Sequence, residues 1–139
     1  CGAMDLLHAG HVLMLKEAKS QCKYLIVGLH TDPTIDRSEK NKPIQSLEER
    51  RIQLEGCKYV DEIQEYDTEE DLHLLLEELQ AIHGDKFVRI IGADWRGKRF
   101  TGCDLNIDVI FNSRNHNYSS SELRRRIFSR ESSSGKKAL

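Results

Sequence analysis

Tyr24-Leu25-Ile26-Val27-Gly28-Leu29 is a near-continuous apolar run in a chain of 139 residues. The run is too short for a buried helix, and its unbroken apolar character is typical of a strand buried on both faces of a parallel sheet. The residues that follow it, His30-Thr31-Asp32-Pro33, form a predicted turn. Because parallel strands need long crossover connections, usually helices, this stretch predicts an α/β fold.

The rest of the chain repeats this alternation of strand and helix. Three further short runs are predicted strands, at Tyr59 to Ile63, Phe87 to Ile91 and Ile107 to Phe111. Helical patterns are predicted at about Leu6 to Gln21, Ser46 to Cys57, Glu69 to His83 and Ser120 to Arg130. We therefore expect one Rossmann-like α/β domain over residues 1–130, with a parallel sheet flanked by helices. The Ser-rich, polar residues 131–139 are a predicted disordered tail.

The predicted helices carry capping residues at their ends. Asp5 is the expected N-cap of the first helix. A Ser three residues before a Glu is a capping box, and two such boxes begin helices, at Ser46 and at Ser119. Gly84 is expected to end the third helix.

Composition excludes several classes of protein. Lys and Arg number 21 against 23 Asp and Glu, so the formal net charge is −2 and nothing favours a nucleic acid or an anionic membrane as partner. No apolar run approaches the roughly 18 residues of a membrane span, and there is no signal-peptide pattern, so we expect a cytoplasmic protein. Four dispersed cysteines without a C-x-x-C pair argue against a zinc or dithiol site and are expected to be reduced thiols, at Cys1, Cys22, Cys57 and Cys103.

Two histidines, His8 and His11, lie three residues apart where the first predicted helix begins. This spacing places them on one face of a helix, so both point into the space above the helix N-terminus. Unpaired N–H groups and the macrodipole make that space a site for anions, phosphate above all. Gly2 and Gly10 let backbone and ligand approach closely.

A helix that binds phosphate in such a fold normally follows a strand and a tight turn. We therefore expect a strand before Cys1, or a shortened strand that includes Cys1 to Ala3.

Two separated motifs resemble a known family. Gly2-Ala3-Met4-Asp5-Leu6-Leu7-His8-Ala9-Gly10-His11 resembles the G-x-F-D-x-x-H-x-G-H signature of the cytidylyltransferase-like nucleotidyltransferases, and Tyr118 to Ile127 resembles their I-S-T-S-x-L-R-x-R-I segment. Within this family, Gly92 to Lys98 is similar to the G-D-D-W-x-G-K stretch of bacterial glycerol-3-phosphate cytidylyltransferases. Asn115 and Asn117 stand where relatives have Thr and Gly, which leaves the choice of base and acceptor open.

The resemblance implies an enzyme that transfers CMP from CTP to a small phosphorylated alcohol, most closely glycerol 3-phosphate, giving a CDP-alcohol such as CDP-glycerol and pyrophosphate. It also implies Mg²⁺ bound with the triphosphate, and a homodimer. An acceptor phosphate oxygen would attack the α-phosphorus in line, so the protein's task is positioning and charge stabilisation. An adenylyltransferase, a sugar-phosphate cytidylyltransferase and a nucleotide-binding module without turnover stay open as alternatives.

The resemblance also implies roles for individual residues. Those expected to act in catalysis are His8, His11, Lys42 and Arg114. Those expected to bind the nucleotide are Gly2, Ala3, Met4, Asp5, Gly10, Lys40, Gly92, Asp94, Asn115, Ser119 and Ser120. Those expected to bind the acceptor are Lys40, Arg50 and Trp95, and no side chain is expected to bind a metal.

Several of these residues also have a plain structural explanation. Asp5 fits a simple helix cap, and Arg50 fits an ion pair with a neighbouring carboxylate. Trp95 fits a core or interface aromatic, and the lysines fit a solvated loop. The arginines at 124–126 favour a solvated helix face, with one of them reaching the triphosphate.

Overall fold

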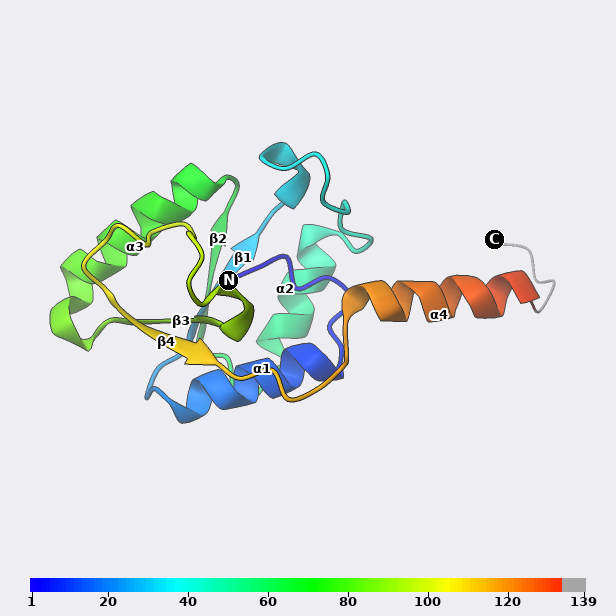
Figure 1. Cartoon of the computed structure of the whole chain (residues 1–139), viewed down its shortest axis with the longest axis horizontal. Coiled ribbons are helices and arrows are strands. Elements are labelled where there is room, and N and C mark those ends of the chain that lie inside the picture. The colour runs from blue at the N-terminus through cyan, green and yellow to red at the C-terminus, as the bar shows by residue number, and fades with distance from the viewer. Residues whose placement is uncertain (134–139) are drawn as a thin grey trace.

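Two pairs of parallel strands, with helices packed around them, form the body of the structure, a computed structural model that describes residues 1–133 (Figure 1). The helices and strands are α1 (Ala9–Ser20), β1 (Ile26–His30), α2 (Leu47–Glu55), β2 (Glu62–Tyr66), α3 (Glu69–His83), β3 (Val88–Gly92), β4 (Asp108–Asn112) and α4 (Ser120–Ser133). Short 3₁₀ helices occur at η1 (Pro33–Ile35), η2 (Gly84–Lys86) and η3 (Ala93–Trp95). The predicted α/β fold with parallel strands and flanking helices is confirmed.

The strands pair in two ladders. β1 pairs with β2 and β3 pairs with β4, both in parallel. The first residues of the chain lie along β1, where the Gly2 N–H donates to the Gly28 carbonyl at 2.9 Å and the His30 N–H donates to the Gly2 carbonyl at 2.9 Å. A short extended segment therefore leads into α1, as the expected shortened strand at Cys1 to Ala3 requires.

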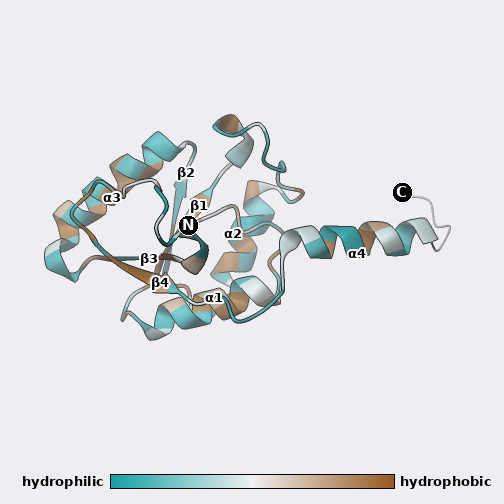
Figure 2. Ribbon diagram, viewed as in Figure 1, coloured by the Kyte–Doolittle hydropathy of each residue, from teal (hydrophilic) through white to brown (hydrophobic). Residues whose placement is uncertain are grey.

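Apolar side chains of the strands and helices meet in the interior. β1 is buried from Val27 to His30, which confirms that this strand is covered on both faces. Figure 2 shows hydrophobic residues on α1, α2 and α3, whereas α4 is mostly hydrophilic. The larger core cluster joins the N-terminal segment, α1, β1 and α2 through Met4, Leu15, Ala18, Leu25, Val27, Leu29 and Leu54. A second cluster forms between β2 and α3.

The first helix begins later than predicted, and Asp5 does not cap it. His8 is the N-cap: its side chain accepts from the Gly10 N–H at 3.0 Å, and the His11 side chain accepts from the His8 N–H at 3.1 Å. The preceding chain cannot be helical because Met4 and Leu6 have φ angles of 53° and 51°. The N-cap prediction for Asp5 is therefore wrong.

The other predicted boundaries differ by a few residues. Each strand ends later than predicted, at His30, Tyr66, Gly92 and Asn112. Three of these residues are polar or glycine, so the apolar signal stops before the ladder does. α4 continues to Ser133, beyond the predicted domain end at residue 130. The remainder of the predicted disordered tail, residues 134–139, lies outside the described part of the chain.

The other helix ends follow the prediction. Ser46 and Glu49 form the expected capping box of α2, and Gly84 ends α3 with a φ of 59°. The four cysteines are free thiols. Within residues 1–133, no helix combines the length and the apolar character needed to cross a membrane.

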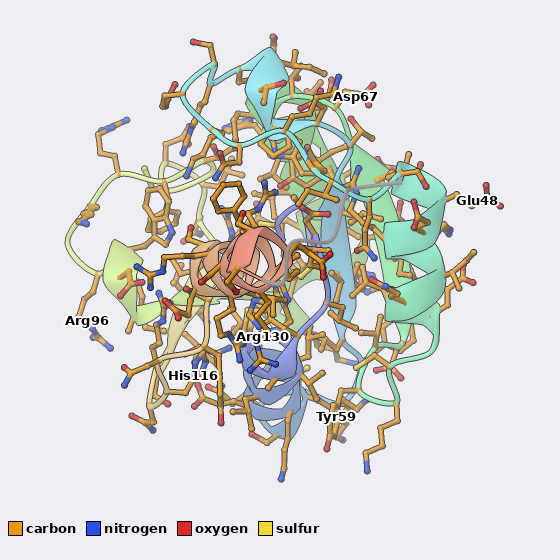
Figure 3. The ribbon with its side chains drawn as sticks, turned by 90° about the vertical axis from the view of Figure 1, so that its right-hand side faces the viewer. Glu48, Tyr59, Asp67, Arg96, His116 and Arg130 are labelled. Atoms are coloured by element: carbon orange, nitrogen blue, oxygen red, sulfur yellow. The ribbon has the colours of Figure 1, made fainter. Side chains whose placement is uncertain are left out.

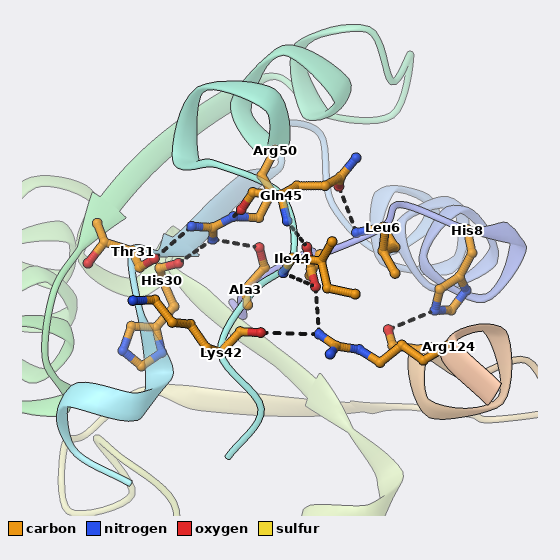
Figure 4. A network of polar contacts seen from close by, with 12 residues as sticks. Ala3, Leu6, His8, His30, Thr31, Lys42, Ile44, Gln45, Arg50 and Arg124 are labelled. Atoms are coloured by element: carbon orange, nitrogen blue, oxygen red, sulfur yellow. Dashed lines mark hydrogen bonds and ion pairs between the residues drawn. The ribbon is translucent and has the colours of Figure 1, made fainter. Parts of the chain in front are cut away.

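Arg50 of α2 joins the N-terminal segment to the end of β1 (Figure 4). It is only 2% exposed, and its guanidinium donates to the carbonyls of Ala3 (3.0 Å), His30 (2.7 Å), Thr31 (2.6 Å) and Gln45 (3.2 Å). Within residues 1–133 its partners are these carbonyls, so the alternative of an ion pair with a neighbouring carboxylate is not found. Contact with the acceptor stays a prediction for this residue.

We expect Arg50→Ala to lower the free energy of unfolding by roughly 3 kcal/mol or more, because a buried carbonyl left without a donor costs about 1–3 kcal/mol. Urea unfolding followed by circular dichroism measures this change. Arg51→Ala is the matched control: Arg51 is the next residue of α2 and makes exposed ion pairs with Glu55 (3.1 Å) and Glu65 (3.0 Å). Its loss should stay below about 1 kcal/mol. Equal losses in the two variants would contradict the structural role of Arg50.

Candidate active site

The ends of all four strands line one cavity of about 470 Å³. His30, Tyr66, Gly92 and Asn112, the last residues of the strands, are all part of its wall. Open α/β sheets bind their ligands at this carboxyl edge. Of the residues predicted from the sequence, the cavity is lined by Gly2, Ala3, Met4, Asp5, His11, Lys40, Gly92, Trp95 and Ser120.

His8 and His11 lie side by side beside the start of α4, with ring centroids 3.9 Å apart. The Nδ1 atom of each ring accepts a backbone N–H: His8 from Gly10, and His11 from His8. In the neutral form each ring therefore carries its proton on Nε2. The Nε2 atom of His8 lies 3.2 Å from the Ser120 hydroxyl (Figure 4). The backbone thus fixes both histidines as Nε2–H donors.

The surroundings keep both rings neutral. Burial, with a smaller contribution from His8, lowers the pKa of His11 from 6.5 to about 4. Burial also lowers the pKa of His8, helped by His116 and Arg114. At neutral pH neither Nδ1 atom is protonated, so each can keep accepting its backbone N–H, that of Gly10 for His8 and that of His8 for His11.

Gly10 leaves room for the rings of His8 and His116, which come from opposite ends of the chain and lie close together at this residue. A Cβ atom on Gly10 would lie 2.8 Å from Cε1 of His8 and 2.9 Å from Cε1 of His116. The His116 ring stacks on Tyr118, and its Nδ1 atom accepts the Tyr118 N–H at 3.1 Å. His116 was not predicted as a site residue, and only its place in the altered loop at 114–120 points to it.

The carboxylate of Asp5 connects the N-terminal segment with the backbone at Ile44 and Gln45 and with α4 (Figure 4). Its carboxylate accepts the N–H groups of Ile44 and Gln45, both at 2.9 Å, and the Arg124 guanidinium at 2.8 Å. Arg124 also donates to the Lys42 carbonyl at 3.3 Å. The Arg124 side chain is therefore not simply solvated. It joins the backbone at Lys42 and the carboxylate of Asp5 to α4.

The two predicted lysines differ in their placement. Lys40 lines the cavity, whereas the exposed Lys42 side chain is not part of its wall and only the Lys42 carbonyl is held by Arg124. Trp95 lies at the rim, 37% exposed, with the Arg37 guanidinium 6.0 Å from its ring centre. The alternative of a core position for Trp95 is excluded.

Four further predicted residues, Asp94, Arg114, Asn115 and Ser119, are not part of the cavity wall. Arg114 pairs with Asp94 at 3.1 Å, and both side chains are exposed. Asn115 is exposed and donates to the Ser113 hydroxyl at 3.1 Å. The Ser119 hydroxyl accepts the Glu122 N–H at 3.1 Å, as expected for a helix cap. The roles of these residues in catalysis and nucleotide binding stay predictions.

Several residues of the cavity wall were missed from the sequence. They are Arg37, Tyr66, Glu69, Arg89, Thr101 and Ser121. Arg89 had a visible signal, because a charge in the middle of an apolar strand has no place in an ordinary core.

One group of side chains within residues 1–133 brings three metal-ligand atoms within 4.8 Å of one another: His30, Asp36 and Glu69. Asp36 accepts the Glu69 N–H at 2.6 Å, and Glu69 accepts the Thr101 hydroxyl at 2.7 Å. Mg²⁺ prefers oxygen ligands and substrate phosphates to a histidine nitrogen. Asp5, near the histidines, is engaged by its own donors. Mg²⁺ bound with the triphosphate stays a prediction.

Comparison with known proteins agrees with this geometry. Residues 1–126 match the model of the family described as cytidylyltransferase-like. The chain belongs to the cytidylyltransferase-like family. Its histidine pair, the cavity at the strand ends and the start of α4 all lie within the matched residues.

Relatives of this cytidylyltransferase-like chain include longer proteins. It is 39% identical over 109 residues to the bifunctional protein HldE of Wolinella succinogenes, which covers 78% of the chain and 22% of that protein. It is 47% identical over 62 residues to a probable ethanolamine-phosphate cytidylyltransferase of Encephalitozoon cuniculi, covering 45% of the chain and 19% of that protein. An ethanolamine-phosphate cytidylyltransferase of Arabidopsis thaliana is 43% identical over 63 residues, covering 45% of the chain and 15% of that protein. The chain thus spans about a fifth of these relatives.

We expect Gly10→Ala to reduce kcat/KM by about 100-fold, since a 1 Å misplacement near a reacting group has an effect of this size. The added methyl must displace the rings of His8 and His116, whose nitrogens are fixed by hydrogen bonds. The helix itself should not weaken, because Ala is a better helix former than Gly by about 1 kcal/mol. Steady-state kinetics and thermal unfolding measure the two effects. Ala9→Ser, an exposed change at the preceding residue, is the control and should retain activity. If Gly10→Ala lost stability and activity together, the result would contradict the conclusion that Gly10 acts by leaving room for the rings of His8 and His116.

The low pKa of His11 predicts a pH dependence of stability. Its pKa is about 4 in the folded chain against 6.5 for an unperturbed histidine, so the unfolded chain binds more protons between these values. The stability from neutral His11 is complete above pH 6.5 and is lost as the pH falls toward 4. His11→Asn keeps an acceptor for the His8 N–H but does not titrate. The stability difference between wild type and this variant should therefore shrink from pH 6.5 to pH 4, measured by urea unfolding. A constant difference would show that His11 has an ordinary pKa.

Proposed function

We propose that this domain transfers CMP from CTP to the phosphate of a small phosphorylated alcohol, with release of pyrophosphate. The main supporting observation is the histidine pair: both rings are held as neutral Nε2–H donors beside Ser120 and the N-terminus of α4. Two histidine donors and the starts of α1 and α4 form a surface that is complementary to a phosphate chain.

The proposed reaction needs no covalent intermediate on the protein. An acceptor phosphate oxygen forms a bond to the α-phosphorus while the bond from that phosphorus to the bridging oxygen breaks, and pyrophosphate takes the bonding electrons. Negative charge grows on the leaving oxygens, where preorganised N–H donors are most effective. His8 and His11 supply these donors, and Lys40 on the cavity wall supplies a positive charge. Mg²⁺ bound with the triphosphate would neutralise further charge.

Glycerol 3-phosphate is the first acceptor that we propose, because Gly92 to Lys98 resembles the corresponding stretch of its cytidylyltransferases. Ethanolamine phosphate is the second, since two of the similar relatives are named for it. A sugar phosphate as acceptor and ATP as donor are the remaining candidates. A homodimer and a cytoplasmic location stay predictions from the sequence.

The assay follows pyrophosphate release from CTP and Mg²⁺ with each acceptor, and repeats the panel with ATP. We expect turnover with CTP and one of the first two acceptors, and a loss of at least about 100-fold in kcat for His8→Gln, because removing one donor to a developing negative charge costs about 100- to 1000-fold.

Lys16→Gln is the control, because Lys16 is exposed on α1, is not part of the cavity wall and lies outside the motifs and residues predicted for the site. Its turnover should equal that of wild type. Binding of CTP by calorimetry without turnover of any acceptor would reject the enzyme and favour a nucleotide-binding module. Turnover with ATP alone would reject CTP as the donor.

A further inference from the structure

Arg89 is a buried charge on the cavity wall. It occupies the second position of β3 and is 8% exposed. One of its terminal nitrogens donates to the Thr101 carbonyl, and the other lies 3.8 Å from the sulfur of Cys1. The guanidinium carbon lies 5.2 Å from the centre of the Phe100 ring. Thiol sulfur is a weak acceptor, so within residues 1–133 the Thr101 carbonyl is the only strong hydrogen-bond partner of Arg89.

Arg89 has no ion pair within residues 1–133, since no carboxylate oxygen lies within ion-pair distance of its guanidinium. Buried charges in proteins are normally paired or fully hydrogen-bonded, because removing a charge from water is unfavourable. The buried Arg50 follows this rule with four carbonyls. Arg89 does not, and it is part of the cavity wall.

Arg89 contacts a different set of residues from the histidines. Its neighbours Thr101, Phe100 and Cys1 share no hydrogen bond or ring contact with His8, His11 or Ser120. In-line attack requires the acceptor oxygen and the leaving pyrophosphate on opposite sides of the α-phosphorus. If His8 and His11 bind the phosphates of the nucleotide, the phosphate group of the acceptor needs a second anion site that is separate from these two histidines.

We propose that Arg89 binds the phosphate group of the acceptor, whose oxygens would accept from the guanidinium N–H groups that have no strong partner within residues 1–133. This assignment rests on the proposed function for the identity of the anion. Arginine suits the task because its planar fork can bind two phosphate oxygens at once. The Thr101 carbonyl and the Phe100 ring hold the guanidinium at the cavity wall, and the proposal requires its remaining N–H groups to face the cavity.

The test uses Arg89→Met and Arg89→Lys, with Arg96→Met as the matched control. Arg96 also lies over an aromatic ring, that of Phe111 at 4.5 Å, but it is exposed and points away from the body (Figure 3). Calorimetry with inorganic phosphate at constant ionic strength measures anion binding without nucleotide. We expect Arg89→Met to lose one phosphate site or about 10- to 100-fold in its affinity, and Arg89→Lys to retain part of it. Arg96→Met should bind as wild type.

Kinetics and stability complete the test. In Arg89→Met the KM for the acceptor should rise about 10- to 100-fold, while the KM for CTP changes less than about twofold. The melting temperature without ligand should not fall, because the variant removes an unpaired buried charge. Unchanged phosphate binding, or a lower melting temperature with equal changes in both KM values, would overturn the proposal and make Arg89 structural. If no acceptor turns over in wild type, the proposed function fails. The phosphate titration then still decides whether Arg89 is an anion site.

Discussion

The carboxylate of Asp5 is the point on which the site depends. α4 contributes no buried residue to the body, and Figure 1 shows it extending away from the other elements. Its first turns are instead held by polar contacts: Arg124 to Asp5, and Ser120 to His8. The same carboxylate fixes the backbone at Ile44 and Gln45. A buried carboxylate is tolerated here because three donors satisfy it. The proposed phosphate-binding surface thus combines the starts of α1 and α4, which apolar packing does not join.

Two buried arginines show how the same side chain serves different purposes. Arg50 gives its donors to carbonyls at the end of β1 and the N-terminal segment, so its burial is compensated within the fold. Within residues 1–133 Arg89 is buried with one carbonyl partner and no ion pair, beside an open cavity, although Glu69 lies close enough to favour its charge. In a folded domain an uncompensated charge is kept at a cost in stability, and ligand-binding sites are where such a cost is expected.

Much of the fold was predictable from local patterns. The apolar run at 24–29, the leucine-rich third helix and the capping box at Ser46 are strong signals, since each depends on residues that are neighbours in the chain. The strand ends were placed too early because His30 and Asn112 complete their ladders with polar side chains that face the cavity. Local patterns describe burial better than hydrogen-bond register.

The candidate site was predictable in its composition more than in its contacts. The paired histidines and Ser120 were found from motifs, but the bond from Asp5 to Arg124 joins residues 119 positions apart. No local pattern reports such a contact. The cap at the first helix was misassigned for a related reason: Asp is a good N-cap, but this Asp is used elsewhere and a histidine takes its place.

The left-handed backbone at Met4 and Leu6 has a consequence for how the signature segment acquires its shape. Neither residue is glycine, and each such conformation costs about 1–2 kcal/mol. The segment holds it because Met4 is buried in the core and the Leu6 N–H donates to the Gln45 side chain at 2.7 Å. A peptide of these residues alone would relax into ordinary extended or helical states, and the two histidine rings would separate. The geometry of the signature segment therefore depends on its packing against the rest of the domain, through Met4 in the core and the Gln45 side chain.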